Sequence, residues 1–166
     1  MSRFDELRKI RCLLAIFMAA LVISGATAFA IETELTTLCS VFGIDSDAEN
    51  TSIAHFLQST KESFTEMNQK APQIAYGYDW LAFAHIVIAL LFIGPYRDPI
   101  GNKWVIQWGL IACAAILPLA LICGIIRQIP PYWRLIDCSF GIIGAIPLLL
   151  CLKYIKALEN RHKGNE

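Results

Sequence analysis

The chain has 166 residues, of which 56% are hydrophobic and only 17% are charged, and its mean hydropathy is +0.53. Water-soluble domains usually carry about 25% charged residues, so this composition excludes an ordinary soluble domain and favours an integral membrane protein. The fourteen basic and fourteen acidic residues balance to a formal charge of zero. The expected partner is the lipid bilayer, and no nucleic-acid partner is expected.

Four apolar segments follow one another along the chain and carry no Asp, Glu, Lys or Arg. They cover residues 12–31, 80–96, 104–126 and 138–152. An α-helix rises about 1.5 Å per residue, so about 20 residues are needed to cross a hydrocarbon core of roughly 30 Å. The fourth run is too short and Lys153 follows it, so its helix must extend backwards through Asp137 and Arg134. We therefore predict four spans, at about residues 12–31, 79–96, 104–127 and 132–153.

The first 30 residues also fit a cleaved signal peptide. A basic start and an apolar stretch lead to the small-residue sequence ATAFA, which resembles a cleavage site. Asp5 and Glu6 in the basic region, and an apolar run long enough to span, favour a retained first helix instead. We expect the retained helix; cleavage would leave three spans.

Basic residues mark one side of the predicted bundle. Ten of the fourteen Lys and Arg residues flank the spans on the side that holds both termini, and nine of the fourteen acidic residues fall on the other side. Cytoplasmic loops carry the excess of Lys and Arg. We therefore expect both termini in the cytoplasm and a multi-pass protein of the plasma or inner membrane.

The main segment outside the membrane is an outer, extracytoplasmic loop over residues 32–78. Within it, apolar residues recur at helical spacing, which predicts a short amphipathic helix. These residues are Ile53, Phe56, Leu57, Phe64 and Met67. The helix could cap the bundle or offer a docking surface to a partner. The predicted fold is thus an all-α integral membrane four-helix bundle, a single domain over residues 1–166.

The fourth span carries charged and small residues on one face. Arg134, Asp137, Gly141 and Gly144 lie along one helical stripe. Small residues and polar residues both turn toward neighbouring helices in membranes, so this face is predicted to be packed. We expect the Asp137 carboxylate to be compensated by Arg134 or by Arg127 at the end of the third span.

The second span adds polar residues to the same outer side. Asp79 begins that span, and Tyr78 and His85 share one of its faces. The candidate ligand-binding residues are therefore Tyr78, Asp79, His85, Arg127, Arg134 and Asp137. The alternative for the same residues is a packed ion pair beside a neutral, hydrogen-bonded core histidine.

Three functions stay open at this point. The first is binding of an amphipathic or lipid-like ligand, whose anionic group Arg127 and Arg134 would hold. The second is a structural or accessory subunit that binds a membrane-protein partner through residues 32–78; a homo-oligomer is the other protein assembly expected. The third is an intramembrane enzyme with His85 or Asp137 as general acid or base. A transporter is less favoured, because 166 residues without an inverted repeat would need oligomerisation to build a path.

The cysteines and histidines point to no cofactor. The six cysteines are scattered without a CxxC pair, and only one of the three histidines lies in a predicted span. A thiol–disulfide centre needs paired cysteines, and a structural metal site needs closely spaced ligands. We therefore predict no metal, no haem and no other cofactor.

Overall fold

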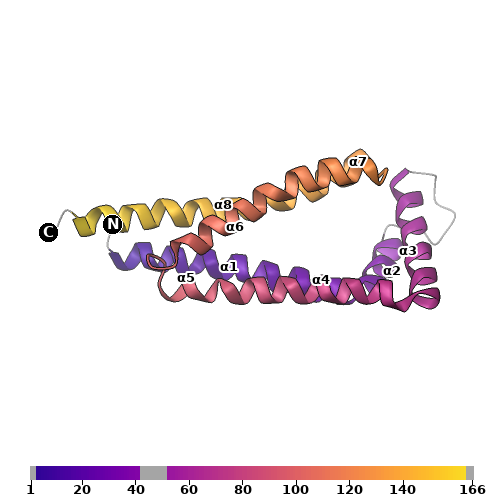
Figure 1. Cartoon of the computed structure of the whole chain (residues 1–166), viewed down its shortest axis with the longest axis horizontal. Coiled ribbons are helices and arrows are strands. Elements are labelled where there is room, and N and C mark those ends of the chain that lie inside the picture. Colours follow the sequence, from indigo (N-terminus) through magenta and orange to yellow (C-terminus); the bar gives the residue numbers. More distant parts are fainter. Residues whose placement is uncertain (1–2, 42–51, 164–166) are drawn as a thin grey trace. The chain divides into compact units, whose positions relative to one another are not determined.

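The computed structural model describes residues 3–41 and 52–163, and every regular element in these two ranges is a helix (Figure 1). In chain order the elements are α1 (Arg3–Phe29), α2 (Ile31–Val41), α3 (Ser52–Lys70), α4 (Pro72–Leu91), α5 (Ile93–Arg97), α6 (Lys103–Pro118), the π-helix η1 (Leu119–Cys123), α7 (Gly124–Ile126) and α8 (Pro131–Lys163).

Four helical stretches of the described ranges are long and apolar enough to cross a membrane. They are Phe4–Phe29, Pro72–Arg97, Lys103–Ile126 and Pro131–Asn160. The predicted all-α class is therefore confirmed, the four stretches are candidates for the four predicted spans, and the chain has the character of a multi-pass membrane protein.

The ends of the elements differ from the prediction. The second span begins at Pro72, well before residue 79, because proline is favoured in the first turn of a helix, where its missing N–H costs nothing. The predicted outer loop holds two helices, α2 and α3, rather than one. Leu35 and Cys39 of α2 are buried and lie four positions apart. This is the spacing of apolar residues that indicates a helix in that stretch.

The chain divides into two compact units. The first unit consists of Met1–Ala20 and Ala89–Glu166, and the second of Leu21–Ile88. The single domain expected over residues 1–166 stays a prediction.

In the first unit, α6 and α8 pack along each other (Figure 1), and small residues lie at their contact. A β-carbon added at Gly141 of α8 would lie 2.5 Å from the carbonyl oxygen of Cys113 in α6. One added at Gly144 would lie 3.2 Å from the Cys113 Sγ. Cys138, on the same stripe, is also buried. The predicted packed face of the fourth span is therefore confirmed.

Helix α1 joins this pair through apolar contacts. The Phe17 ring meets the Phe92 ring edge to face, with centroids 4.8 Å apart. Ile10 and Leu14 are fully buried, and the Cys151 thiol donates to the Ile10 carbonyl oxygen over 3.8 Å. These contacts place an apolar stripe of α1, formed by Ile10, Leu14 and Phe17, in the core of the unit.

Polar contacts tie the helices together near the chain termini. Lys103 at the start of α6 pairs with Glu159 near the end of α8, with 2.8 Å between Nζ and Oε2. Arg11 Nε donates to the backbone oxygen of Tyr96 over 3.3 Å. The Lys9 ammonium lies 5.6 Å from the centre of the Tyr154 ring, within the range of a cation–π contact.

The third span contains a wide turn just after Pro118. Proline has no N–H to donate to the preceding turn, and the next N–H, that of Leu119, is shared between the oxygens of Ala115 and Ile116. The following five residues form η1, after which α7 resumes the α-helical pattern. The missing donor therefore accounts for the start of the wide turn.

Helix α7 ends in a Schellman motif. The N–H of Ile129 donates to Gly124 O over 2.8 Å, and that of Gln128 donates to Ile125 O over 3.0 Å. Gln128 has a positive φ of 56°, the left-handed conformation that normally favours glycine. Pro130 and Pro131 come next, and α8 begins at Pro131, so the turn between the third and fourth helical stretches is short and defined.

The second unit contains a close crossing of α1 and α4 at Gly25. A β-carbon there would lie 2.7 Å from Ala82 O and 3.1 Å from the His85 Cβ. Beyond this crossing, α2 and α3 pack on each other. Of the residues predicted for the apolar face of the loop helix, Leu57 and Phe64 are buried, whereas Ile53 is exposed.

We expect Gly141→Ala to lower the free energy of unfolding by about 1–3 kcal/mol, because the new methyl would press on a backbone oxygen that cannot rotate away. The matched control is Gly77→Ala in α4, where no atom lies within 4 Å of the new carbon. Helix propensity predicts a neutral or slightly stabilising effect for the control. Thermal unfolding in one detergent compares the two, and equal shifts would contradict the α6–α8 contact.

We expect Gln128→Gly to raise the free energy of unfolding by about 0.5–1 kcal/mol. The left-handed conformation costs a residue with a β-carbon about 1–2 kcal/mol, and part of the gain is offset by the greater freedom of glycine in the unfolded chain. Gln128→Ala keeps the β-carbon and should give no such gain. The same thermal unfolding measurement applies, and stabilisation by alanine alone would rule out backbone strain as the cause.

Candidate ligand-binding site

The six residues predicted from the sequence belong to two different units. Tyr78, Asp79 and His85 lie on α4 in the second unit. Arg127 follows α7, and Arg134 and Asp137 lie near the start of α8, all in the first unit. The convergence of all these groups on one site stays a prediction.

In the first unit, Arg134 packs over a glycine of the preceding span. A β-carbon added at Gly124 would meet Arg134 Cδ and would lie 2.7 Å from its Cγ. The Arg134 Nε is buried and makes no hydrogen bond to any residue in 3–41 or 52–163. In the same ranges no ion pair joins Asp137 to Arg134 or Arg127. The compensation expected for Asp137 is therefore not seen, and the Arg134 stem instead fills the space beside Gly124.

In the second unit, His85 is bonded within its own helix. Its Nδ1 lies 2.8 Å from the carbonyl oxygen of Leu81. A carbonyl oxygen can only accept, so Nδ1 carries the proton and donates. Because the Cβ of the same residue lies against Gly25 at the helix crossing, the geometry matches that of a hydrogen-bonded packing histidine.

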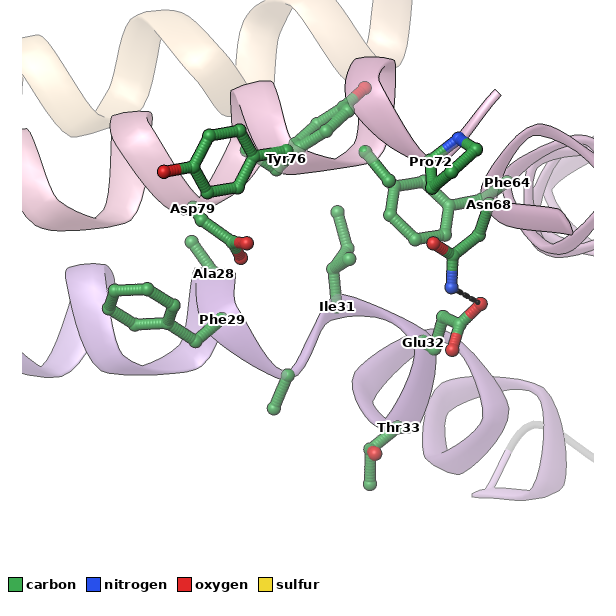
Figure 2. A pocket seen from close by; sticks show the side chains of 13 residues that line it. Ala28, Phe29, Ile31, Glu32, Thr33, Phe64, Asn68, Pro72, Tyr76 and Asp79 are labelled. Atoms are coloured by element: carbon green, nitrogen blue, oxygen red, sulfur yellow. Dashed lines mark hydrogen bonds between the residues drawn. The ribbon is translucent and has the colours of Figure 1, made fainter. Parts of the chain in front are cut away.

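The second unit also contains a pocket of about 490 Å³ (Figure 2). Its walls come from the end of α1, the start of α2, the last turns of α3 and the start of α4. They include Phe29, Glu32, Phe64, Tyr76, Tyr78 and Asp79. Two of the predicted site residues, Tyr78 and Asp79, therefore line one pocket together.

The floor of the pocket lies where α1 ends and α2 begins. Figure 2 shows the backbone changing direction between Phe29 and Ile31. Just before this point the Thr27 hydroxyl donates to the Ser24 carbonyl oxygen over 3.1 Å. Because the two helices do not continue as one, space remains beside α4.

Two contacts hold the walls of the pocket together. The rings of Phe64 and Tyr78 pack edge to face with centroids 5.2 Å apart, which joins α3 to α4. The Asn68 Nδ2 donates to Glu32 Oε1 over 3.1 Å, which joins α3 to α2 (Figure 2). Sequence reasoning missed Glu32, Asn68 and Phe29, because these residues come from segments far apart in the chain and no local pattern links them.

The pocket is electrostatically negative. The Asp79 carboxylate points into the space between α4 and the end of α1 (Figure 2). Asp79 is half-buried and has no hydrogen bond or ion pair with any other described residue. The segment 21–88 has eight acidic and two basic residues, a formal charge of −6. Neither basic residue lines the pocket, and one of them, Lys70, pairs with Glu66.

No family model matches this chain, and no curated protein or solved structure is significantly similar to it. Across the described residues, no group of three or more His, Cys, Asp or Glu side chains is arranged to hold a metal ion.

We expect Gly124→Ala and Arg134→Ala to be coupled by about 1 kcal/mol. In the native chain the new methyl at 124 must displace the arginine stem, whereas in the Arg134→Ala background that space is empty. Thermal unfolding of the native protein, both single variants and the double variant gives the coupling free energy. If Gly124→Ala destabilises both backgrounds equally, Arg134 does not occupy the position described.

Proposed function

We propose that this protein is a four-span membrane protein that binds an amphipathic molecule in the pocket of its second unit. The observation that carries the proposal is the pocket itself, whose volume of about 490 Å³ lies within the roughly 300–1,000 Å³ typical of small-molecule sites. Its aromatic walls suit an apolar group, and the Asp79 carboxylate suits a polar one.

The distribution of charge supports an outward-facing pocket. Lys and Arg residues are concentrated beside both termini and in the connection between the second and third spans, which favours a cytoplasmic location for these segments. Helices α2 and α3 then lie on the extracytoplasmic side, and the pocket lies at the level where the first and second spans reach the membrane surface. An amphipathic molecule is the class of ligand enriched at that level.

A row of aromatic residues leads from the pocket along α4. Tyr76 lines the pocket, and its ring packs edge to face on Trp80 at 6.0 Å, which in turn packs on Phe83 at 6.4 Å. All of this row is well exposed at the surface of the unit. Tyrosine and tryptophan are enriched at membrane interfaces, so a ligand with its head in the pocket could lay its tail beside this row, in lipid.

The pocket does not include the two arginines first expected to hold the ligand. The predicted anionic group required Arg127 and Arg134, which belong to the other unit, whereas the pocket offers Tyr78 and Asp79. Neither His85 nor Asp137 lines this pocket, and neither is assigned a catalytic role.

The test uses a photoreactive amphiphile with a twelve-carbon tail, a diazirine and a neutral hydroxyl headgroup. We expect it to label peptides from the walls of the pocket, read by mass spectrometry after irradiation in a maltoside detergent. Ala75 lines the pocket, and the exposed Ile74 beside it does not. Ala75→Trp should therefore reduce labelling at least tenfold, whereas Ile74→Trp should change it less than twofold.

Both tryptophan variants are first compared with the native protein by thermal unfolding, so that a loss of labelling is interpreted only for folded protein. Equal labelling of the native protein and a folded Ala75→Trp variant would contradict binding in this pocket.

A further inference from the structure

We infer that the pocket of the second unit selects an amphiphile with a purely cationic headgroup, of the alkylammonium class, and that Asp79 is the residue that recognises the charge. This inference rests on the proposed function, because it specifies the ligand of the same pocket. Four observations carry it: the state of Asp79, the absence of basic residues on the walls, the aromatic side chains, and the charge of the surrounding segment.

The first observation is the state of the Asp79 carboxylate. Its carboxylate is half-buried, points into the pocket and has no partner among the described residues (Figure 2). A charged group withdrawn from water loses solvation free energy unless an opposite charge or hydrogen-bond donors compensate it. Glu32, the other carboxylate of the pocket, already accepts a hydrogen bond from Asn68. A ligand cation would therefore be stabilised more beside Asp79 than beside Glu32.

The walls contain no lysine or arginine within the part of the chain that the structure describes. An anionic headgroup would bring a second negative charge next to Asp79 with nothing to neutralise it. A zwitterionic headgroup such as phosphocholine carries a cation that fits but also a phosphate that lacks a basic partner. A headgroup with positive charge alone avoids both costs.

Aromatic side chains provide the second element of cation recognition. Phe64, Tyr76 and Tyr78 all line the pocket beside Asp79. The faces of aromatic rings attract cations within about 6 Å, and ammonium groups are commonly bound by several rings together. The edge-to-face contact between Phe64 and Tyr78 fixes the orientation of two of these rings relative to each other. A carboxylate beside aromatic rings is complementary to an alkylammonium group.

The negative charge of the surrounding segment also favours a cationic ligand. Residues 21–88 carry a formal charge of −6, whereas the rest of the chain carries +6. A local field of one sign raises the concentration of oppositely charged ligands near the surface. This field is general, so an experiment must separate it from recognition by Asp79 itself.

The experiment compares three photoreactive probes that share one twelve-carbon diazirine tail and differ in the headgroup: trimethylammonium, hydroxyl and phosphocholine. Each probe is titrated against the full chain in a neutral maltoside detergent, and labelling of the pocket walls gives the half-saturating concentration. Two variants are compared with the native protein. Asp79→Asn removes the pocket charge, and Glu62→Gln removes one negative charge from the exposed surface of α3, outside the pocket.

We expect the trimethylammonium probe to reach half-saturation at a concentration at least tenfold lower than the other two probes. Asp79→Asn should abolish this preference by raising the half-saturating concentration of the trimethylammonium probe at least tenfold, whereas Glu62→Gln should preserve the preference.

Equal binding of the three probes to the native protein would overturn the charge inference while leaving the proposed pocket intact. An equal loss in both variants would overturn the role of Asp79 and assign the preference to the general field. Tight binding of the phosphocholine probe would overturn the restriction to purely cationic headgroups. Absence of labelling at the pocket walls by all three probes would instead overturn the proposed function.

Discussion

The absence of a side chain at Gly141 allows α8 to approach the Cys113 carbonyl of α6, and the first unit depends on this approach. In a bilayer, apolar side chains gain little by leaving lipid, so helices associate through close packing and polar contacts. The contact at Gly141 sets the separation at which Cys113 can also lie beside Gly144. Near the termini, the pair between Lys103 and Glu159 joins the same two helices. The close contact at Gly141 and the ion pair between Lys103 and Glu159 thus hold α6 against α8 at two separate positions along the helices.

The sequence was sufficient to predict four long apolar helices, because an uncharged apolar stretch long enough to cross the hydrocarbon core is the strongest signal of a membrane helix. It was less informative about where each helix ends. Backbone hydrogen bonding continues beyond the apolar residues, so α4 starts at Pro72 and α8 continues beyond Lys153. Hydropathy reports which residues tolerate lipid, and it does not report which residues are helical.

The candidate site was predictable only in part. Tyr78 and Asp79 were found because polar residues at the end of an apolar run stand out. Phe29, Glu32 and Asn68 were not found, because the walls form only when the ends of four helices come together. The spacing of Arg134 and Asp137 suggested an ion pair, but spacing cannot reveal that Gly124 leaves room for the arginine stem. Arg134 packs on a glycine of the neighbouring helical stretch instead of pairing with Asp137. This is a tertiary contact, which the local sequence does not encode.

The wide turn η1 has a consequence for the tolerance of this chain to changes in length. A π-turn holds one residue more than an α-turn. Loss of one residue between 119 and 123 would therefore remove the extra residue of the wide turn while keeping both Cys113 and Gly124 directed toward α8. The same loss between 110 and 112 would rotate everything beyond it by about 100° and would carry Gly124 away from Arg134. Natural variation in the length of the third span should accordingly be confined to these five residues.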